Sequence, residues 1–269
     1  MRNYLHNLLT RWTFIRWQLC LPALFLTAIW PSAPDACSRL LWNNNGDQVI
    51  VGRNMDWFNT FKNFLFIMPR GIQVMGGTPE NPMTWNVKYG NIISTISARP
   101  SRQGPLAMVD NAADGLNEKG LAAHFLFLSG SVYENRDLSR PGVSTLRWVS
   151  YLLDNFSTVN EALVGMDKIQ IVPSKFNGYT MDFHVAIEDK TGDSAIIEFI
   201  GGKKTVYHDR DFIVLTNNPS YDAQIRNLTQ YRTFGGTKPL PGNIESTDRF
   251  VRLQYFSQYL PQTKDKNKA

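Results

Sequence analysis

The chain has 269 residues, of which 43% are hydrophobic and 19% charged, and its formal net charge is +5 at pH 7. The charged fraction lies below the average of about 25% for soluble domains, so the composition excludes a disordered, collagen-like or coiled-coil chain. Two cysteines are too few for a disulfide scaffold or a cysteine-rich zinc module. The length is sufficient for one domain with a large core.

Residues 1–36 are typical of a secretory signal peptide. Three arginines and no acidic residue precede an apolar stretch from Leu19 to Trp30, and small and polar residues follow it. A basic region before a short apolar stretch is the pattern of a signal peptide, whereas a helix needs about 20 apolar residues to span a bilayer. We therefore predict an exported protein, periplasmic or secreted, with an uncleaved membrane anchor as the alternative.

Removal of this segment would change two of the opening counts. It would take away three arginines and one aspartate, so the net charge would fall from +5 to +3, which gives little reason to expect nucleic-acid binding. It would also remove Cys20 and leave Cys37 at or near the new N-terminus. A single thiol in an exported protein calls for a chemical explanation.

A β-hairpin is predicted directly after Cys37. Residues 38–42 and 48–54 favour strands, and Asn45-Gly46 between them is typical of a two-residue turn. This turn would place Cys37 opposite Asn54. A loop of odd length would instead shift the register by one residue.

Further strands follow the hairpin, and two helices interrupt them. Residues 144–153 have helical apolar spacing, and Thr158 with Glu161 fits a capping box before a second helix. This order indicates a layered α+β domain over residues 37–262, with a frayed lysine-rich tail at 263–269. The predicted strands are 64–68, 87–96, 121–128, 183–188, 194–200 and 211–215.

Several common catalytic motifs are absent from the sequence. There is no glycine-rich dinucleotide or phosphate loop, no zinc-protease motif and no serine-hydrolase elbow. His124, His184 and His208 lack the spacing of metal ligands. We therefore predict neither a cofactor nor a metal. The glycines of Asp114-Gly115 and Gly120 indicate turns, and no chemistry is assigned to them.

Cleavage before Cys37 would place a nucleophile and a base on one residue. A free α-amine has a pKa near 7.7 to 8.0 and can accept the thiol proton at neutral pH. A nearby arginine favours a thiolate, and a carboxylate can orient the amine. The predicted hairpin brings Arg53 and Asp56 close to Cys37.

Six short motifs run through the chain in one order. They are Cys37-Ser38-Arg39, Gly52 to Trp57, Asp114 to Leu121, Asp154-Asn155-Phe156, Leu215 to Pro219, and Leu240-Pro241-Gly242 with Asp248-Arg249-Phe250. Together they resemble the choloylglycine hydrolase family of N-terminal-nucleophile amidases. This family includes bile salt hydrolases, penicillin V acylases and acyl homoserine lactone acylases, and the resemblance covers nearly all of the chain after residue 36.

The resemblance implies the four-layer αββα fold, with the nucleophile at the start of a strand. It also implies five catalytic roles: Cys37 as nucleophile and, through its amine, as base; Arg53 beside the sulfur; Asp56 holding the amine; Asn217 donating to the oxyanion; and Arg249 completing the polar network. As isolated residues, Arg53 and Asp56 would equally fit a strand-end ion pair and Asn217 a turn.

The resemblance also implies a second oxyanion donor and an aromatic pocket. The backbone N–H of Phe127 falls where the family places that donor. The substrate-binding residues would be Trp57, Phe58, Phe61 and Phe127. Taken singly, such aromatic residues belong more often to a core than to a binding site.

The leading hypothesis is an exported, cofactor-independent hydrolase of linear amides that forms an acyl-thioester on Cys37. Its substrate would be a small amide with an apolar or aromatic acyl group, as in penicillin V acylases or acyl homoserine lactone acylases. Conjugated bile salts are the alternative substrate, and the resemblance implies a possible homotetramer.

The expected C-terminal region is short for this family. Relatives normally continue for several strands beyond the segment around Phe250, whereas this chain ends soon after Leu260. Missing strands would leave a sheet edge or part of the core uncovered. One alternative is therefore a truncated, inactive secreted relative that acts as a binding protein or has no activity. A membrane-anchored amidase is another alternative, which follows from an uncleaved segment 1–36.

Overall fold

The computed structural model describes the chain in five ranges, which are 37–46, 48–56, 63–95, 112–176 and 179–262. The predicted signal peptide, the lysine-rich tail and the aromatic residues Trp57, Phe58 and Phe61 lie outside these ranges. None of the helices within them is long and apolar enough to cross a membrane.

Strands make up most of the regular structure in the described ranges. The strands are β1 (Ser38–Asn45), β2 (Gln48–Asn54), β3 (Phe64–Met68), β4 (Gln73–Met75), β5 (Thr84–Asn86), β6 (Asn91–Thr95), β7 (Ala112–Asn117), β8 (Ala122–Phe127), β9 (Gly142–Ser144), β10 (Gln170–Val172), β11 (Lys175–Phe176), β12 (Tyr179–Thr180), β13 (Phe183–Glu188), β14 (Ser194–Ile200), β15 (Lys203–His208) and β16 (Val214–Thr216). The helices are η2 (Thr145–Arg147), α1 (Trp148–Asn155), α2 (Val159–Met166), α3 (Tyr221–Leu228), η3 (Arg232–Phe234) and α4 (Ser246–Ser257), of which η2 and η3 are 3₁₀ helices.

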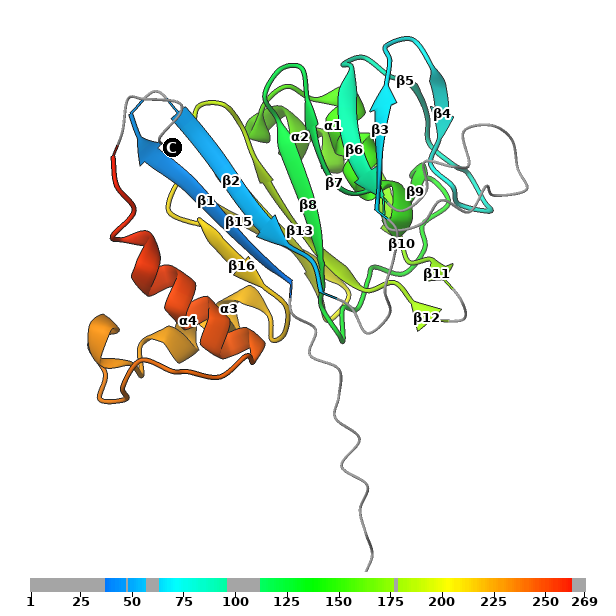
Figure 1. The fold of residues 1–269 in the computed structure, drawn as a ribbon. Coiled ribbons are helices and arrows are strands. Elements are labelled where there is room, and N and C mark those ends of the chain that lie inside the picture. The colour runs from blue at the N-terminus through cyan, green and yellow to red at the C-terminus, as the bar shows by residue number, and fades with distance from the viewer. Residues whose placement is uncertain (1–36, 47, 57–62, 96–111, 177–178, 263–269) are drawn as a thin grey trace, which may run out of the picture. The chain divides into compact units, whose positions relative to one another are not determined.

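Two antiparallel sheets carry the fold. The larger sheet has seven strands in the order β15-β14-β13-β8-β7-β6-β3, and the smaller has three in the order β16-β1-β2. Small two-stranded pairs, β10-β9, β11-β12 and β4-β5, border them. Figure 1 shows the long β1-β2 hairpin beside the strands of the larger sheet.

The two sheets lie between helical layers. One face of the seven-stranded sheet packs against α1 and α2 through a large apolar cluster that includes Val185, Ile197 and Leu152. Its other face meets the three-stranded sheet through a smaller cluster that includes Cys37, Leu126 and Ala186. Helix α4 packs against β1 and β16, and α3 packs against α4 (Figure 1). The αββα architecture expected from the sequence is therefore confirmed.

Local signals explain the starts of the first two helices. Ser144 accepts a hydrogen bond from the backbone N–H of Leu146 at 3.1 Å, so η2 rather than α1 begins at the predicted position. Thr158 caps α2 by accepting from the N–H of Glu161 at 3.2 Å, as predicted. The Glu161 carboxylate closes the turn on the N–H of Ser157 at 2.8 Å, one residue earlier than in a capping box.

The hairpin register differs by one residue from the register set by an Asn45-Gly46 loop. Asn45 pairs with Gln48, so the turn begins at Gly46, whose φ is +64°. At the turn the pairing is therefore two residues from the predicted register, and an irregularity between Trp42 and Asn45 reduces the difference to one along the rest of the hairpin. Ser38, and not Cys37, therefore lies opposite Asn54.

Asp114-Gly115 lies in the interior of β7, where the sequence indicated a turn. A Cβ on Gly115 would stand 2.5 Å from the side chain of Leu153 in α1 and 2.7 Å from the carbonyl oxygen of Ile92. The glycine is therefore explained by the close approach of helix α1 to the sheet. This position also places Asp114 on the opposite face, toward the three-stranded sheet, because side chains alternate along a strand.

Candidate active site

Cys37 immediately precedes β1 and lies between the two sheets, where its residue is only 3% exposed. Its thiol is free. The sulfur lies 3.8 Å from Nη2 of Arg53 and 4.0 Å from the backbone carbonyl oxygen of Asp56. A guanidinium beside a buried sulfur stabilises the negatively charged thiolate, which is the nucleophilic form.

Arg53 reaches Cys37 from the neighbouring strand β2. Its Nη2 also donates to the backbone carbonyl oxygen of Phe125 at 2.7 Å, and its Nη1 forms an ion pair with the carboxylate of Asp114. The guanidinium thus contacts the sulfur of Cys37, a carbonyl oxygen of β8 and a carboxylate of β7. The predicted neighbourhood of Cys37 and Arg53 is present even though the predicted register is shifted.

Asp56 lies two residues beyond β2, on the same side of the hairpin as the sulfur. Its backbone carbonyl oxygen approaches the thiol, and its carboxylate accepts a hydrogen bond from the side chain of Asn54 at 3.0 Å. The contact of the carboxylate with an α-amine of Cys37, which the sequence analysis expects, stays a prediction.

Arg249 brings helix α4 to the start of β1. Its Nη1 donates to the backbone carbonyl oxygen of Cys37 and to the hydroxyl of Ser38. Its Nη2 donates to Oδ1 of Asn217 at 3.2 Å, and its Nε donates to the carbonyl oxygen of Ile244 at 2.9 Å. Burial lowers the pKa of Arg249, while the nearby Cys37 acts in the opposite direction.

Asn217 directly follows β16 and is fully buried. Its Nδ2 donates to the backbone carbonyl oxygen of Phe127 at 2.9 Å. The side chain of Gln224 donates to the backbone carbonyl oxygen of Asn217 at 2.8 Å. The bond to Phe127 and the one from Arg249 fix the orientation of the side-chain amide, and the bond from Gln224 holds the main chain. An amide nitrogen carries two N–H groups, and the bond to Phe127 uses one of them.

Phe127 ends β8 and is partly buried. Its ring packs edge-on against Phe183 with a centroid distance of 6.5 Å. The contact between Phe127 and Asn217 brings the two predicted oxyanion donors to one place. The other predicted pocket residues are the three aromatic residues outside the described ranges.

Four charged residues that the sequence analysis did not assign to the site lie directly behind Arg53. Asp114 accepts from Arg53 with one oxygen and contacts Nδ1 of His124 with the other, at 2.8 Å. Nε2 of His124 contacts Glu188 at 2.6 Å, and Glu188 forms an ion pair with Arg39. The sequence held one signal for them, because Arg39 and Glu188 are charges inside apolar strands, and buried charges are normally paired.

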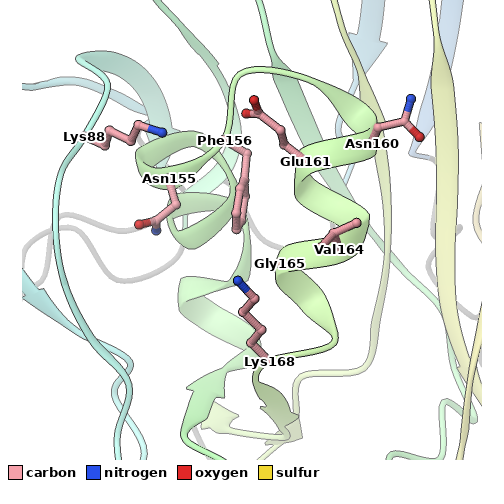
Figure 2. A pocket seen from close by; sticks show the side chains of 8 residues that line it. All are labelled: Lys88, Asn155, Phe156, Asn160, Glu161, Val164, Gly165 and Lys168. Atoms are coloured by element: carbon pink, nitrogen blue, oxygen red, sulfur yellow. The ribbon is translucent and has the colours of Figure 1, made fainter.

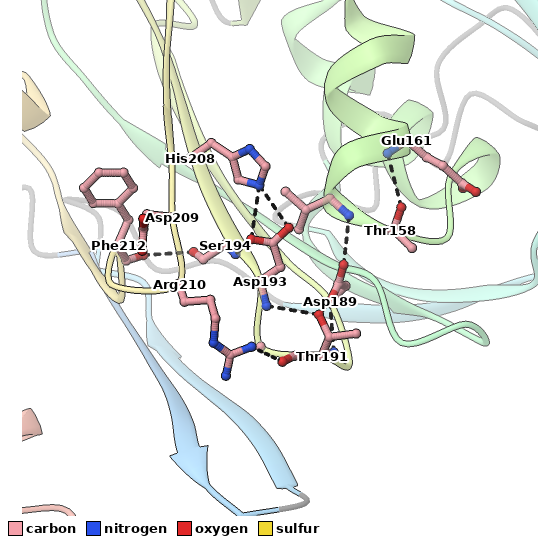
Figure 3. Close-up of polar contacts among 12 residues, drawn as sticks. Thr158, Glu161, Asp189, Thr191, Asp193, Ser194, His208, Asp209, Arg210 and Phe212 are labelled. Carbon is pink, nitrogen blue, oxygen red and sulfur yellow. Dashed lines mark hydrogen bonds and ion pairs between the residues drawn. The ribbon is translucent and has the colours of Figure 1, made fainter.

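Arg39 anchors the far end of this network. It donates to the carbonyl oxygen of Phe212 at 3.0 Å and to the hydroxyl of Ser194 at 3.1 Å. Ser194 in turn donates to the same carbonyl oxygen at 2.9 Å, as Figure 3 shows. The network therefore ends on the loop before β16, which is the strand that leads to Asn217.

The ionisation of the network follows from its charges. Burial lowers the pKa of His124, but the Glu188 and Asp114 carboxylates outweigh it and raise the pKa to about 9. Burial raises the pKa of Glu188, but Arg39 and His124 outweigh it and lower the pKa to about 2. At neutral pH the carboxylate of Glu188 is therefore charged and the imidazole of His124 is an imidazolium.

A separate cavity of about 460 Å³ lies in the helical layer on the other side of the seven-stranded sheet. It shares no residue with the site around Cys37. Its lining, shown in Figure 2, consists of Lys88, Asn155, Phe156, Asn160, Glu161, Val164, Gly165 and Lys168. Among the described residues, no group of three or more histidine, cysteine, aspartate or glutamate side chains is arranged to hold a metal ion.

Comparison with known proteins identifies the class of this fold and site. Residues 37–269 match the linear amide C–N hydrolases of the choloylglycine hydrolase family, and the chain belongs to this family. The fold is that of the N-terminal-nucleophile hydrolases. The structure of penicillin V acylase from Agrobacterium tumefaciens is similar, with a TM-score of 0.73 and 35% identity over 85% of this chain and 67% of that chain.

Two curated relatives show the range of the family. Penicillin V acylase of Pectobacterium atrosepticum is 34% identical over 250 residues, which are 90% of this chain and 65% of that protein. A bile salt hydrolase/transferase of Lactiplantibacillus plantarum is 26% identical over 228 residues, which are 76% of this chain and 66% of that protein. The chain thus spans slightly less than two thirds of the length of these relatives.

Proposed function

We propose that this chain is an exported hydrolase of linear amides whose nucleophile is Cys37, made N-terminal by removal of residues 1–36. The observation that carries the proposal is the position of the Cys37 sulfur, which is buried at the start of β1 and lies 3.8 Å from the guanidinium of Arg53. Asn217 and Arg249 complete a polar surround of the kind that acyl transfer requires.

The reaction would proceed in two stages. The α-amine of Cys37 accepts the thiol proton, the sulfur bonds to the amide carbon, and the carbonyl oxygen becomes an oxyanion held by Asn217 and the backbone N–H of Phe127. The protonated amine then donates to the leaving nitrogen as the C–N bond breaks. Water, deprotonated by the same amine, then attacks the thioester carbon. The C–S bond breaks, the acid is released, and the protonated amine returns its proton to the sulfur.

The other residues support these steps. Arg53 stabilises the thiolate, and Asp56 holds the α-amine toward the reacting groups. Arg249 fixes the main chain at Cys37 and the amide of Asn217. Removal of one oxyanion donor costs about 2.7 to 4 kcal/mol of transition-state stabilisation in comparable sites, so Asn217 would be essential for rate.

The favoured substrates are amides with an aryl or long acyl group. The two penicillin V acylases are 34% and 35% identical to this chain, whereas the bile salt hydrolase is 26% identical. The partly buried ring of Phe127 also favours an apolar acyl group. The aromatic pocket of Trp57, Phe58 and Phe61 and the homotetramer stay predictions, as does bile salt hydrolysis as the alternative.

The test uses the full chain produced in a Gram-negative host and purified from the exported fraction. Mass spectrometry of the N-terminus is expected to find Cys37 as the first residue. The purified protein is then assayed with penicillin V, glycocholate and a long-chain acyl homoserine lactone. A mature protein that keeps residues before Cys37 would contradict the mechanism, because its nucleophile would have no free amine.

Substitution of the nucleophile gives the sharpest result. Cys37→Ala is expected to remove activity completely and to leave the protein folded, whereas Arg70→Ala, at an exposed ion pair with Glu118, is expected to keep full activity. An acyl adduct trapped at low pH should map to Cys37. Full activity in Cys37→Ala would overturn the proposal.

A further inference from the structure

The charged network behind Arg53 is assembled by strand pairing. Arg53 and Arg39 face each other across β2 and β1, and Asp114 and His124 face each other across β7 and β8. Glu188 on β13 completes the connection between His124 and Arg39. Five side chains from five strands thus form one continuous line of alternating charge in the space between the two sheets.

The geometry requires a protonated imidazole at the centre of this line. Both ring nitrogens of His124 lie within hydrogen-bond distance of a carboxylate, Nδ1 at 2.8 Å from Asp114 and Nε2 at 2.6 Å from Glu188. A carboxylate accepts hydrogen bonds, so both nitrogens must donate, and only the imidazolium has two N–H groups. The groups facing it are Asp114, Glu188 and, through them, Arg39 and Arg53.

The line therefore carries one net positive charge, which lies next to the thiol. Three cations and two carboxylates leave an excess of +1, and Arg53 places that charge 3.8 Å from the sulfur. Arg53 is 6% exposed at its side chain, so the charge is poorly screened by water. Its long side chain is held in this pose by the carboxylate of Asp114 together with the carbonyl oxygen of Phe125.

We propose that Asp114, itself oriented by His124, is a positioning residue that holds the guanidinium of Arg53 against the sulfur of Cys37. This inference rests on the proposed role of Cys37 as nucleophile. Asp114 does not touch the sulfur. It acts through Arg53, and the contact with His124 at 2.8 Å holds the Asp114 carboxylate in place.

The experiment measures the reactivity of the thiol itself. Iodoacetamide alkylates thiolates, and fragment-ion mass spectrometry distinguishes Cys37 from Cys20 in protein that keeps residues 1–36, while processed protein holds Cys37 alone. Asp114→Asn keeps the size of the side chain but removes its charge, so Arg53 loses its ionic anchor. The variant also makes the line more positive, but loss of the anchor moves the guanidinium away from the sulfur, and alkylation of Cys37 near neutral pH is therefore expected to slow about tenfold or more. Unchanged or faster alkylation would overturn the inference.

Asp154→Asn is the matched control. Asp154 is also a buried carboxylate, but it lies on the helical side of the sheet, bonded to Trp85 and Asn91. This variant is expected to alkylate like the unmodified protein even if its stability changes. Equal alkylation in Asp114→Asn and Asp154→Asn would overturn the positioning role.

The outcome separates this inference from the proposed function. If the protein hydrolyses amides and Asp114→Asn alkylates normally, the function stands and the positioning role is wrong. If no amide is hydrolysed but alkylation slows as expected, the positioning role stands alone. In an active protein, Asp114→Asn should lower kcat and leave KM nearly unchanged, because substrate binding does not use Asp114.

A measurement on the unmodified protein covers the case in which Asp114→Asn does not fold. The ¹⁵N resonances of His124, assigned by their loss in His124→Gln, are expected to show both ring nitrogens protonated at about pH 8. A neutral imidazole at that pH would break the alternating line of charge and overturn the inference.

Discussion

The two faces of the seven-stranded sheet carry different side chains, because one face is apolar and the other holds the charged network. Along β13, Val185 and Ile187 point into the apolar layer under α1 and α2, whereas His184 and Glu188 point toward the three-stranded sheet. All four residues are buried. One strand thus contributes an ordinary core to one side and a charged layer to the other, which suggests that one face supplies stability and the other an ordered electrostatic environment for Cys37.

The two buried acids Asp154 and Glu188 make the difference explicit. Asp154, on the helical side, accepts from Nε1 of Trp85 and from Nδ2 of Asn91, both at 2.7 Å, and burial raises its pKa to about 6 despite these bonds. Glu188 is equally buried but has a pKa of about 2, because cations surround it. Neutral donors do not offset the cost of burying a carboxylate, and charged partners do.

The largest expected effect tests the charged side. Glu188→Gln leaves His124 and Arg39 buried without their shared anion, so we expect a loss of about 3 to 5 kcal/mol in the free energy of unfolding. Activity should fall as well, because the line that ends at Arg53 is broken. Urea unfolding and the amidase assay measure the two effects.

The matched substitution on the apolar side separates the roles of the faces. Leu152→Ala in α1 removes a fully buried side chain and should cost about 2 to 5 kcal/mol of stability. Activity for each folded molecule should stay unchanged, because Leu152 lies in the apolar layer of the other face. An equal loss of specific activity in both variants would show that the division between the faces is wrong.

A smaller effect, about 3 kcal/mol at most, concerns the pH dependence of stability. The folded pKa of Asp154, about 6, lies above its ordinary value of 3.8, so the folded protein binds this proton more tightly than the unfolded chain. Ionisation of Asp154 therefore removes stability as pH rises from about 4 to 6. Glu188 acts in the opposite sense, because its contribution is present above about pH 4.5 and is lost as pH falls toward 2.

Urea unfolding at a series of pH values measures this contribution. Asp154→Asn cannot ionise, so its stability should lack the decline between about pH 4 and 6 that the unmodified protein shows. Parallel curves for the two proteins would contradict the raised pKa. Both proteins are measured at the same pH values, so the contributions of their other carboxylates to the free energy of unfolding cancel in the difference.

The sequence predicted several strands to the residue but missed others, such as β7 and β15, and placed a strand over 87–96 where the structure has one only over 91–95. The bounds of β2, β3, β13 and β14 agree with the predicted ranges, because runs of apolar and β-branched residues are a local signal. The register of β1 on β2 depends on an irregularity near Trp42 that no local pattern indicates. Asp114 was missed for a related reason, since its contact with Arg53 joins strands about sixty residues apart.

The C-terminal helices show a second limit of local signals. Helix α3 has no side-chain cap from its N-cap residue Ser220. Instead, the carboxylate of Glu198 on β14 accepts from the N–H of Tyr221 at 2.9 Å, and the same carboxylate contacts His184. The start of α3 is thus fixed by a residue more than twenty positions away, and sequence reasoning left this segment unassigned.

The smallest expected effect comes from the part of the charged face that lies beyond the network. Ile67, Ile92 and Leu116 face one another across β3, β6 and β7, in the same row as Glu188, yet they are 81%, 41% and 48% exposed. Such a row of exposed aliphatic side chains favours association.

Ile67→Thr should change the free energy of unfolding by less than about 0.5 kcal/mol, because replacement of an exposed side chain removes little buried surface. It should, however, lower concentration-dependent association in sedimentation velocity more than Val132→Thr, which alters an exposed aliphatic residue outside the row. Equal association in the two variants would show that this row of side chains does not drive self-association of the protein.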